Sequence, residues 1–213
     1  MRTIGLLTGR RTAAAMVAAA LLTLMTAVSA SAGRPDSVDP SLMTPPLNPG
    51  FTWECWGAGD RIVCDGVRTT TYEAAEAIPC DDGWIYATGI ARDTLRRIGD
   101  ADGRALTTLG TTRIDDTLSR SPAFDGIVGS ARGSWTDFYE YGVPGDLSSR
   151  VVTRRGVELV LTIPGQGMVV LDAGIKSWDI EGNILFARGP HDLVEDIDGA
   201  IGRACDALAG TAA

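Results

Sequence analysis

The sequence predicts a mainly β protein: an antiparallel sandwich or barrel-like sheet with one C-terminal α-helix packed on it and two disulfides. Short runs rich in β-branched and aromatic residues recur, with turn signals about every 8–12 residues. Helical periodicity is convincing only near the C-terminus. The 4 cysteines form an even set, which indicates a disulfide framework in an exported chain.

Strand-like runs begin at Phe51. Phe51, Trp53 and Cys55 alternate with Thr, Glu and Trp, which is the two-residue period of a strand. Residues 57–60 supply a turn, and residues 61–64 return alongside the first run. Two more strand-like runs and a tight Asp-Ala-Asp-Gly turn follow at residues 67–72, 83–90 and 100–103.

The second half carries the clearest strand pattern. Val157, Leu159, Leu161 and Ile163 point to one face of a strand, and the residues between them point to the other. A Pro-Gly-Gln-Gly turn at residues 164–167 leads into an apolar run at 168–171. Two further strand-like runs, at 175–180 and 184–187, flank a Glu-Gly-Asn turn at 181–183.

One helix is predicted, over about residues 190–209. Pro190 suits the first helical position, and Gly210 suits the end. Apolar residues at helical spacing form one stripe, which consists of Val194, Ile197, Ile201, Ala204, Cys205 and Leu208. Cys205 therefore lies on the buried face of the predicted helix.

Four cysteines allow three pairings. We favour Cys55–Cys64, because a short turn separates two strand-like runs there, and this leaves Cys80–Cys205. The second bond would pin the helix over the sheet. No pair of cysteines has CxxC spacing and the chain has 1 histidine, so the sequence predicts no metal site and no cofactor.

The N-terminus indicates export. Residues 1–32 contain three basic residues, an apolar stretch at 12–28, and the small-x-small site Ala30-Ser31-Ala32, which together are typical of a secretory signal peptide. Cleavage is expected after Ala32, or else after Ala30, and the general secretory route is favoured over twin-arginine export. Half of the 10 prolines fall in residues 33–50, which predicts a flexible, solvated linker before a single domain at residues 51–210.

Charge excludes one class of partner. The net charge is −8, and loss of the three signal arginines lowers it to −11 in the mature chain. Such an acidic protein repels phosphate backbones, so nucleic acid is not an expected partner. No second apolar run reaches membrane-spanning length, so no membrane contact is expected after signal cleavage.

The sequence predicts no catalytic residue. His191 is the only histidine, follows Pro190 at the expected helix start, and is interpreted as a surface residue. The doublets Asp81-Asp82 and Asp115-Asp116 are interpreted as solvated charges, because adjacent strand residues point to opposite faces. Asp100-x-Asp102-Gly103 resembles the start of a calcium loop but lacks its later ligands, which favours a hairpin turn.

Aromatic residues gather at one place in an aromatic-poor chain. Trp135, Phe138, Tyr139 and Tyr141 stand close to the Pro144-Gly145 turn. They form either part of the core or a platform that stacks on sugar rings or on a partner's apolar patch. The candidate ligand-binding residues are therefore Trp135, Tyr139 and Tyr141.

Several motifs carry a resemblance to a loosely defined group of proteins. They are Trp53-x-Cys55, Cys64, Cys80, Asp102-Gly103-Arg104, Pro144-Gly145-Asp146, residues 164–167, Asp172-Ala173-Gly174 and Cys205. In this layout the chain resembles a group of exported actinobacterial proteins of unknown function. The resemblance implies export and two disulfides, and it implies no activity.

These observations favour a secreted, non-catalytic binding or interaction domain with a protein or cell-wall glycan as its extracellular partner. The alternatives are an extracellular hydrolase that uses carboxylates, and an inhibitor of secreted proteases. A cleft with two carboxylates about 5–10 Å apart would favour the hydrolase. A flat, exposed aromatic patch would favour the binding domain, and a rigid loop braced by a disulfide would favour the inhibitor.

Overall fold

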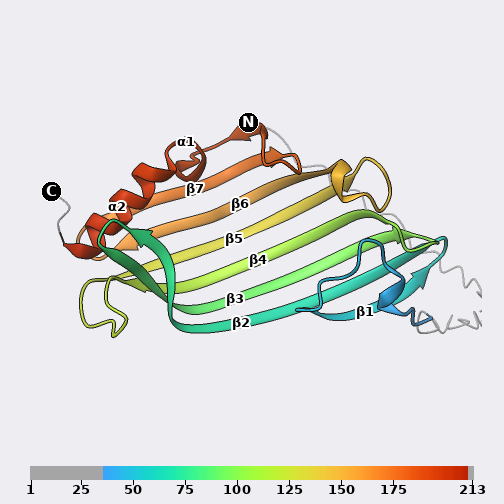
Figure 1. Cartoon of the computed structure of the whole chain (residues 1–213), viewed down its shortest axis with the longest axis horizontal. Coiled ribbons are helices and arrows are strands. Elements are labelled where there is room, and N and C mark those ends of the chain that lie inside the picture. Colours follow the sequence, from blue (N-terminus) through green and yellow to red (C-terminus); the bar gives the residue numbers. More distant parts are fainter. Residues whose placement is uncertain (1–35, 211–213) are drawn as a thin grey trace, which may run out of the picture. The chain divides into compact units, whose positions relative to one another are not determined.

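One antiparallel sheet of eight strands dominates the computed structural model, which describes residues 36–210 (Figure 1). Each strand pairs with the next one along the chain. The strands are β1 (Thr52–Ala58), β2 (Arg61–Cys80), β3 (Gly83–Asp100), β4 (Ala105–Ser119), β5 (Val128–Tyr141), β6 (Arg150–Ile163), β7 (Gly167–Trp178) and β8 (Ile184–Arg188). The predicted signal peptide, residues 1–32, lies outside the described residues.

The predicted fold class is confirmed: the protein is mainly β and antiparallel, with a C-terminal helix and two disulfides. Within residues 36–210 the strands form one open sheet, because β1 pairs only with β2 and β8 only with β7. Several strands are longer than the apolar runs that predicted them. β2, for example, has 20 residues, since polar Thr and Glu residues continue its pairing with β3.

The two faces of the sheet differ. Ile85 and Ala87 of β3 and Leu118 of β4 point to the side on which the C-terminal helix packs, which we call the helix face. Residues at alternate positions, such as Ile90 and Arg92, point to the opposite side, which we call the open face. The main hydrophobic core therefore lies between one end of the helix face and the helix.

The C-terminal helix is interrupted once. A single turn, α1 (Asp192–Glu195), precedes α2 (Ile197–Ala209), and the break falls at Asp196, whose side chain caps α2 by accepting from the Gly199 N–H. Gly210 ends α2 in the left-handed conformation, as predicted. The predicted start at Pro190 is two residues too early, because α1 begins at Asp192. The Pro190 carbonyl instead accepts a hydrogen bond from the Ala173 N–H of β7.

Both predicted disulfides are present. Cys55 and Cys64 lie directly opposite each other on β1 and β2. Cys80, at the end of β2, is bonded to Cys205 of α2, and Figure 1 shows this hairpin end beside the helix. Ala200, Ala204 and Leu208 bury the same side of α2 against the sheet. The long-range bond thus joins the two parts that enclose the core.

Residues 36–50 correct the expectation of a flexible linker. A short 3-10 helix, Pro40–Leu42, leads into Met43, which is 2% exposed and packs with Ile62 and with the Cys55–Cys64 bond. Val38 and Leu47 join this second core. The apolar side chains between the prolines provide enough burial to hold the segment against the sheet.

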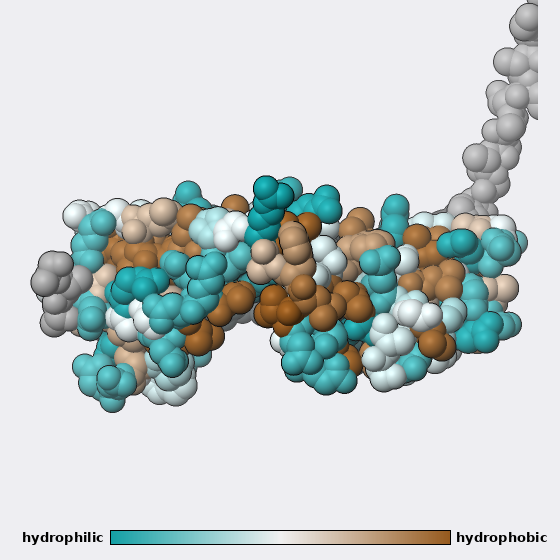
Figure 2. Space-filling view, turned by 90° about the horizontal axis from the view of Figure 1, so that it is seen from above, coloured by the Kyte–Doolittle hydropathy of each residue, from teal (hydrophilic) through white to brown (hydrophobic). Residues whose placement is uncertain are grey.

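The two edges of the sheet differ in how they are covered. A bridge between Ser37 and Trp56 covers the edge of β1. Among residues 36–210 no strand pairs with the outer edge of β8, whose Ile184, Leu185 and Phe186 are all exposed. Figure 2 looks from the β7 side and shows hydrophobic residues near the middle of that side. None of the helices within residues 36–210 combines the length and the apolar character needed to cross a membrane.

Candidate functional site

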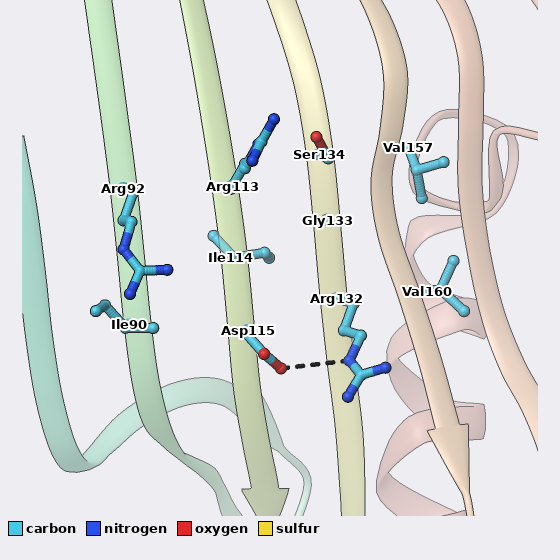
Figure 3. Close-up of a pocket in the computed structure, with 10 residues that line it drawn as sticks. All are labelled: Ile90, Arg92, Arg113, Ile114, Asp115, Arg132, Gly133, Ser134, Val157 and Val160. Carbon is cyan, nitrogen blue, oxygen red and sulfur yellow. Dashed lines mark hydrogen bonds and ion pairs between the residues drawn. The ribbon is translucent and has the colours of Figure 1, made fainter.

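A hollow of about 470 Å³ crosses β3 to β6 on the open face (Figure 3). We call it the arginine pocket, after Arg92, Arg113 and Arg132. Figure 3 shows these three side chains on three neighbouring strands. The apolar residues that line the hollow are Ile90, Ile114, Val157 and Val160.

Strand register places the three arginines together. Arg92 of β3 lies directly opposite Arg113 of β4, and Arg113 lies opposite Ser134 of β5. Arg132 of β5 lies opposite Asp115 of β4, and this pair is two residues along the strands from the Arg113–Ser134 pair. Residues on one face repeat every second position, so all of these side chains project to the same side of the sheet.

Irregular pairing produces the hollow. The β5–β6 register shifts between Arg132 and Ser134, and the β6–β7 register shifts between Val157 and Leu159. Gly133 lies at the first shift, and a side chain there would collide with the backbone carbonyl of Glu158. Bulges of this kind bend the strand locally and are frequent beside functional sites.

The pocket has unbalanced positive charge. Arg132 pairs with Asp115 at 3.3 Å, but both side chains are exposed, and such surface pairs contribute little. Arg92 and Arg113 have no ion pair or side-chain hydrogen bond with any residue in the described range 36–210. Like charges directly opposite each other on neighbouring strands destabilise a sheet. A bound anion would remove that repulsion.

The predicted aromatic residues lie on the other side of the sheet. Trp135 and Tyr139 are half-buried on the helix face, and Tyr141 is 9% exposed. Trp135 donates its ring N–H to Asp137 at 3.2 Å, and the Tyr139 hydroxyl donates to the same carboxylate at 3.4 Å. They are therefore engaged with the protein's own side chains and do not form a flat exposed platform.

An ion-pair network adjoins these aromatics. Arg154 donates to Asp137 at 2.7 and 2.9 Å and to Glu158, and its guanidinium lies over the rings of Trp135 and Trp178. Burial tends to lower the pKa of Arg154, but the hydrogen bond to Asp137 and the negative charges of Asp137 and Glu158 together outweigh burial and raise it. The cation is thus held by carboxylates on both sides.

The network continues to the C-terminal segment. Lys176 contacts Glu158 at 2.5 Å and Asp172 at 3.4 Å, and Asp172 is 3.1 Å from Nδ1 of His191. His191 is 2% exposed, so its interpretation as a surface residue was wrong. The cause is tertiary: an isolated bridge pairs His191 with Asp172 of β7, and α1 starts directly after it.

This network has the character of a structural unit. Asp137, Glu158 and Asp172 are each bound by a cation of the protein, and Asp172 also accepts from the Leu193 N–H at the start of α1. Within the described range, no group of three His, Cys, Asp or Glu side chains is arranged to hold a metal ion.

Asp115 and Asp116 point to opposite faces, as expected, but Asp116 is half-buried, so its interpretation as a solvated charge was wrong. Asp115 faces the arginine pocket, whereas Asp116 lies on the helix face and accepts a hydrogen bond from the Tyr72 hydroxyl at 2.5 Å. Asp82 pairs with Arg120 at the end of the β2–β3 hairpin. Asp100 binds the backbone and side chain of Arg104 in a hairpin turn, in which Gly103 has a positive φ of 80°.

Asp116→Asn is expected to gain stability over the natural protein as pH rises above about 4. Burial raises the pKa of the Asp116 carboxyl, against the opposing hydrogen bond from Tyr72. A raised pKa in the folded state means that stability is lost as pH rises through it, and the Asn variant escapes this loss while keeping an acceptor for Tyr72. Urea unfolding at acidic and neutral pH measures the difference, with Asp115→Asn as the exposed control. If the difference in unfolding free energy between Asp116→Asn and the natural protein is the same at both pH values, the pKa of Asp116 is not raised in the folded state.

Comparison with protein-family models, with curated proteins and with solved structures finds no match to the chain. The sequence contained one signal for the arginine pocket. Arg92, Arg113 and Arg132 stand 21 and 19 residues apart, a spacing that matches successive long hairpin strands only once the register is known.

Proposed function

We propose that this protein is an exported, non-catalytic binding domain whose ligand is an anionic extracellular glycan held at the arginine pocket. The observation that carries the proposal is the pair of opposed arginines, Arg92 and Arg113, neither of which makes an ion pair with any residue in the described range. Export is proposed from the N-terminal segment, and the two disulfides are compatible with it.

Arginine suits a carboxylate or phosphate ligand. Its planar guanidinium offers paired N–H donors that match two oxygens of such a group. Arg92 and Arg113 project from adjacent strands into one hollow, so they can hold the same anion from two sides. Ile90, Val157 and Val160 give the pocket an apolar wall for the nonpolar face of a sugar ring.

Hydroxyl side chains beside the pocket favour a glycan. Thr94, Thr111 and Thr136 lie opposite one another across β3, β4 and β5, directly next to the arginines. Thr117 and Ser130 form a similar pair on the other side of the pocket. A sheet face that carries rows of hydroxyl side chains beside guanidinium groups matches a polymer with sugar hydroxyls and regularly spaced acidic groups.

Polygalacturonate is the test ligand for carboxylates, and neutral dextran is the comparison. In isothermal titration calorimetry, the mature protein is expected to bind polygalacturonate and not dextran, with affinity falling as salt is added. Arg113→Met is expected to lower the affinity about tenfold or more, since a hydrogen-bonded charge pair is worth about 1.5–3 kcal/mol.

The matched control is Arg61→Met, which removes an exposed arginine outside the pocket. Equal losses from Arg61→Met and Arg113→Met would show that only overall charge matters, and would contradict the proposed site. The polymer is expected to be recovered at its original length. Shortened chains would instead support the carboxylate hydrolase.

A further inference from the structure

A second group of arginines lies on the helix face, away from the arginine pocket. Arg97 of β3 and Arg150, the first residue of β6, converge over the side chains of Thr108 and Tyr139. Arg97 donates to the Pro45 carbonyl at 2.8 Å and to the Thr108 hydroxyl at 3.3 Å. Arg150 lies over the Tyr139 ring, 5.5 Å from its centre. We call these two residues the Arg97–Arg150 pair.

Neither arginine of the pair has a carboxylate partner among residues 36–210. Burial lowers the pKa of Arg97, and the positive charge of Arg150 lowers it further, so the two cations are close enough to repel. The Nε atom of Arg150 is fully buried and has no hydrogen-bond acceptor. A buried donor without an acceptor is rare, and each case calls for an explanation.

Other arginines on the same face show what is missing. Arg68 is bound by Asp93 at 2.7 Å, and Arg154 is bound by Asp137 and Glu158. The fold thus supplies a carboxylate to each of these two cations. At the Arg97–Arg150 pair it supplies only neutral groups: carbonyls, a hydroxyl and an aromatic ring.

We propose that the Arg97–Arg150 pair binds a small oxyanion: sulfate, phosphate or a carboxylate group. The anion would accept from the guanidinium groups on both sides. Thr108 accepts a hydrogen bond from Arg97, so its own O–H can donate to the anion. The site lies on the opposite face from the arginine pocket and does not depend on the proposed function.

Sulfate is the first probe. We expect calorimetry on the mature protein, at an ionic strength held constant with chloride, to show saturable sulfate binding. Arg150→Met and Arg97→Met are each expected to weaken binding at least tenfold. Arg113→Met, in the arginine pocket, is expected to keep the affinity within about twofold. Phosphate and acetate, titrated in the same way, distinguish tetrahedral from planar oxyanions.

Thermal unfolding separates this role from simple packing. Without sulfate, Arg150→Met is expected to melt at or above the natural protein's temperature, because it removes both the repulsion and the unpaired Nε. Added sulfate is expected to stabilise the natural protein but not the variant. Arg150→Lys keeps the charge without the planar fork, and is expected to bind with intermediate affinity.

Two results would overturn the proposal. One is unchanged sulfate affinity in both methionine variants, which would place the anion elsewhere. The other is a natural protein that binds none of the three anions while Arg150→Met melts several degrees lower, which would make Arg150 a packing residue over Tyr139. Loss of sulfate binding in Arg113→Met alone would assign the anion to the arginine pocket and would also overturn the proposal.

Discussion

Replacing both Cys80 and Cys205 by alanine is expected to lower the free energy of unfolding by roughly 4–5 kcal/mol. The bond joins residues 125 apart in the sequence, so in the chain-entropy model it removes much of the freedom of the unfolded chain. In the folded state it also holds α2 against the end of β2, where Ala204 and Leu208 are buried. Urea unfolding followed by circular dichroism measures the loss.

The double replacement of Cys55 and Cys64 is the matched control. These residues are 9 apart, and the model predicts a loss of roughly 2.5–3 kcal/mol. The two bonds therefore differ in loop length while each variant removes two sulfur atoms. If removal of the Cys55–Cys64 bond lowers the free energy of unfolding as much as removal of the Cys80–Cys205 bond, or more, loop closure is not the main source of stabilisation.

Arg154→Met is expected to destabilise the protein by about 3–5 kcal/mol. Asp137 is 6% exposed and would be left buried without its cation, whereas Glu158 would keep Lys176. The cost comes from the uncompensated carboxylate rather than from the lost attraction alone. Urea unfolding at neutral pH measures it.

Asp137→Asn completes a double-mutant cycle. The double variant is expected to lose less free energy of unfolding than the sum of the losses in the two single variants, because no buried charge is then left unpaired. Arg96→Met supplies the surface comparison, since the Arg96–Asp65 pair is exposed and its loss is expected to cost under about 1 kcal/mol. An Arg154→Met cost no larger than that of Arg96→Met would contradict the role of burial.

Local patterns in the sequence were sufficient for the disulfides and for part of the C-terminal stripe. Cys55 and Cys64 flank a short turn, so their pairing followed from hairpin geometry, and Cys205 was placed correctly by helical spacing. The stripe was accurate for Ala204 and Leu208 but not for Ile197, which is 52% exposed because α2 begins there at its outer end.

Features that depend on register or on distant residues were not predicted. His191 is buried because of Asp172, which precedes it by 19 residues, and Met43 is buried because Ile62 and a disulfide lie above it. Proline content alone gave no sign of that packing. The arginine pocket depends on the alignment of four strands, and the pairing of Arg92 with Arg113 across β3 and β4 has no local signal in the sequence.

The most direct test of the arginine pocket is a nuclear magnetic resonance titration that follows the Nε–H signals of the arginine side chains as a galacturonate oligosaccharide is added. Signals are assigned with Arg92→Lys and Arg113→Lys. Binding in the pocket is expected to shift the Arg92 and Arg113 signals saturably and to leave the signal of the exposed Arg61 unchanged. Unchanged Arg92 and Arg113 signals, or equal shifts at Arg61, would contradict the claim that the pocket binds an anionic glycan.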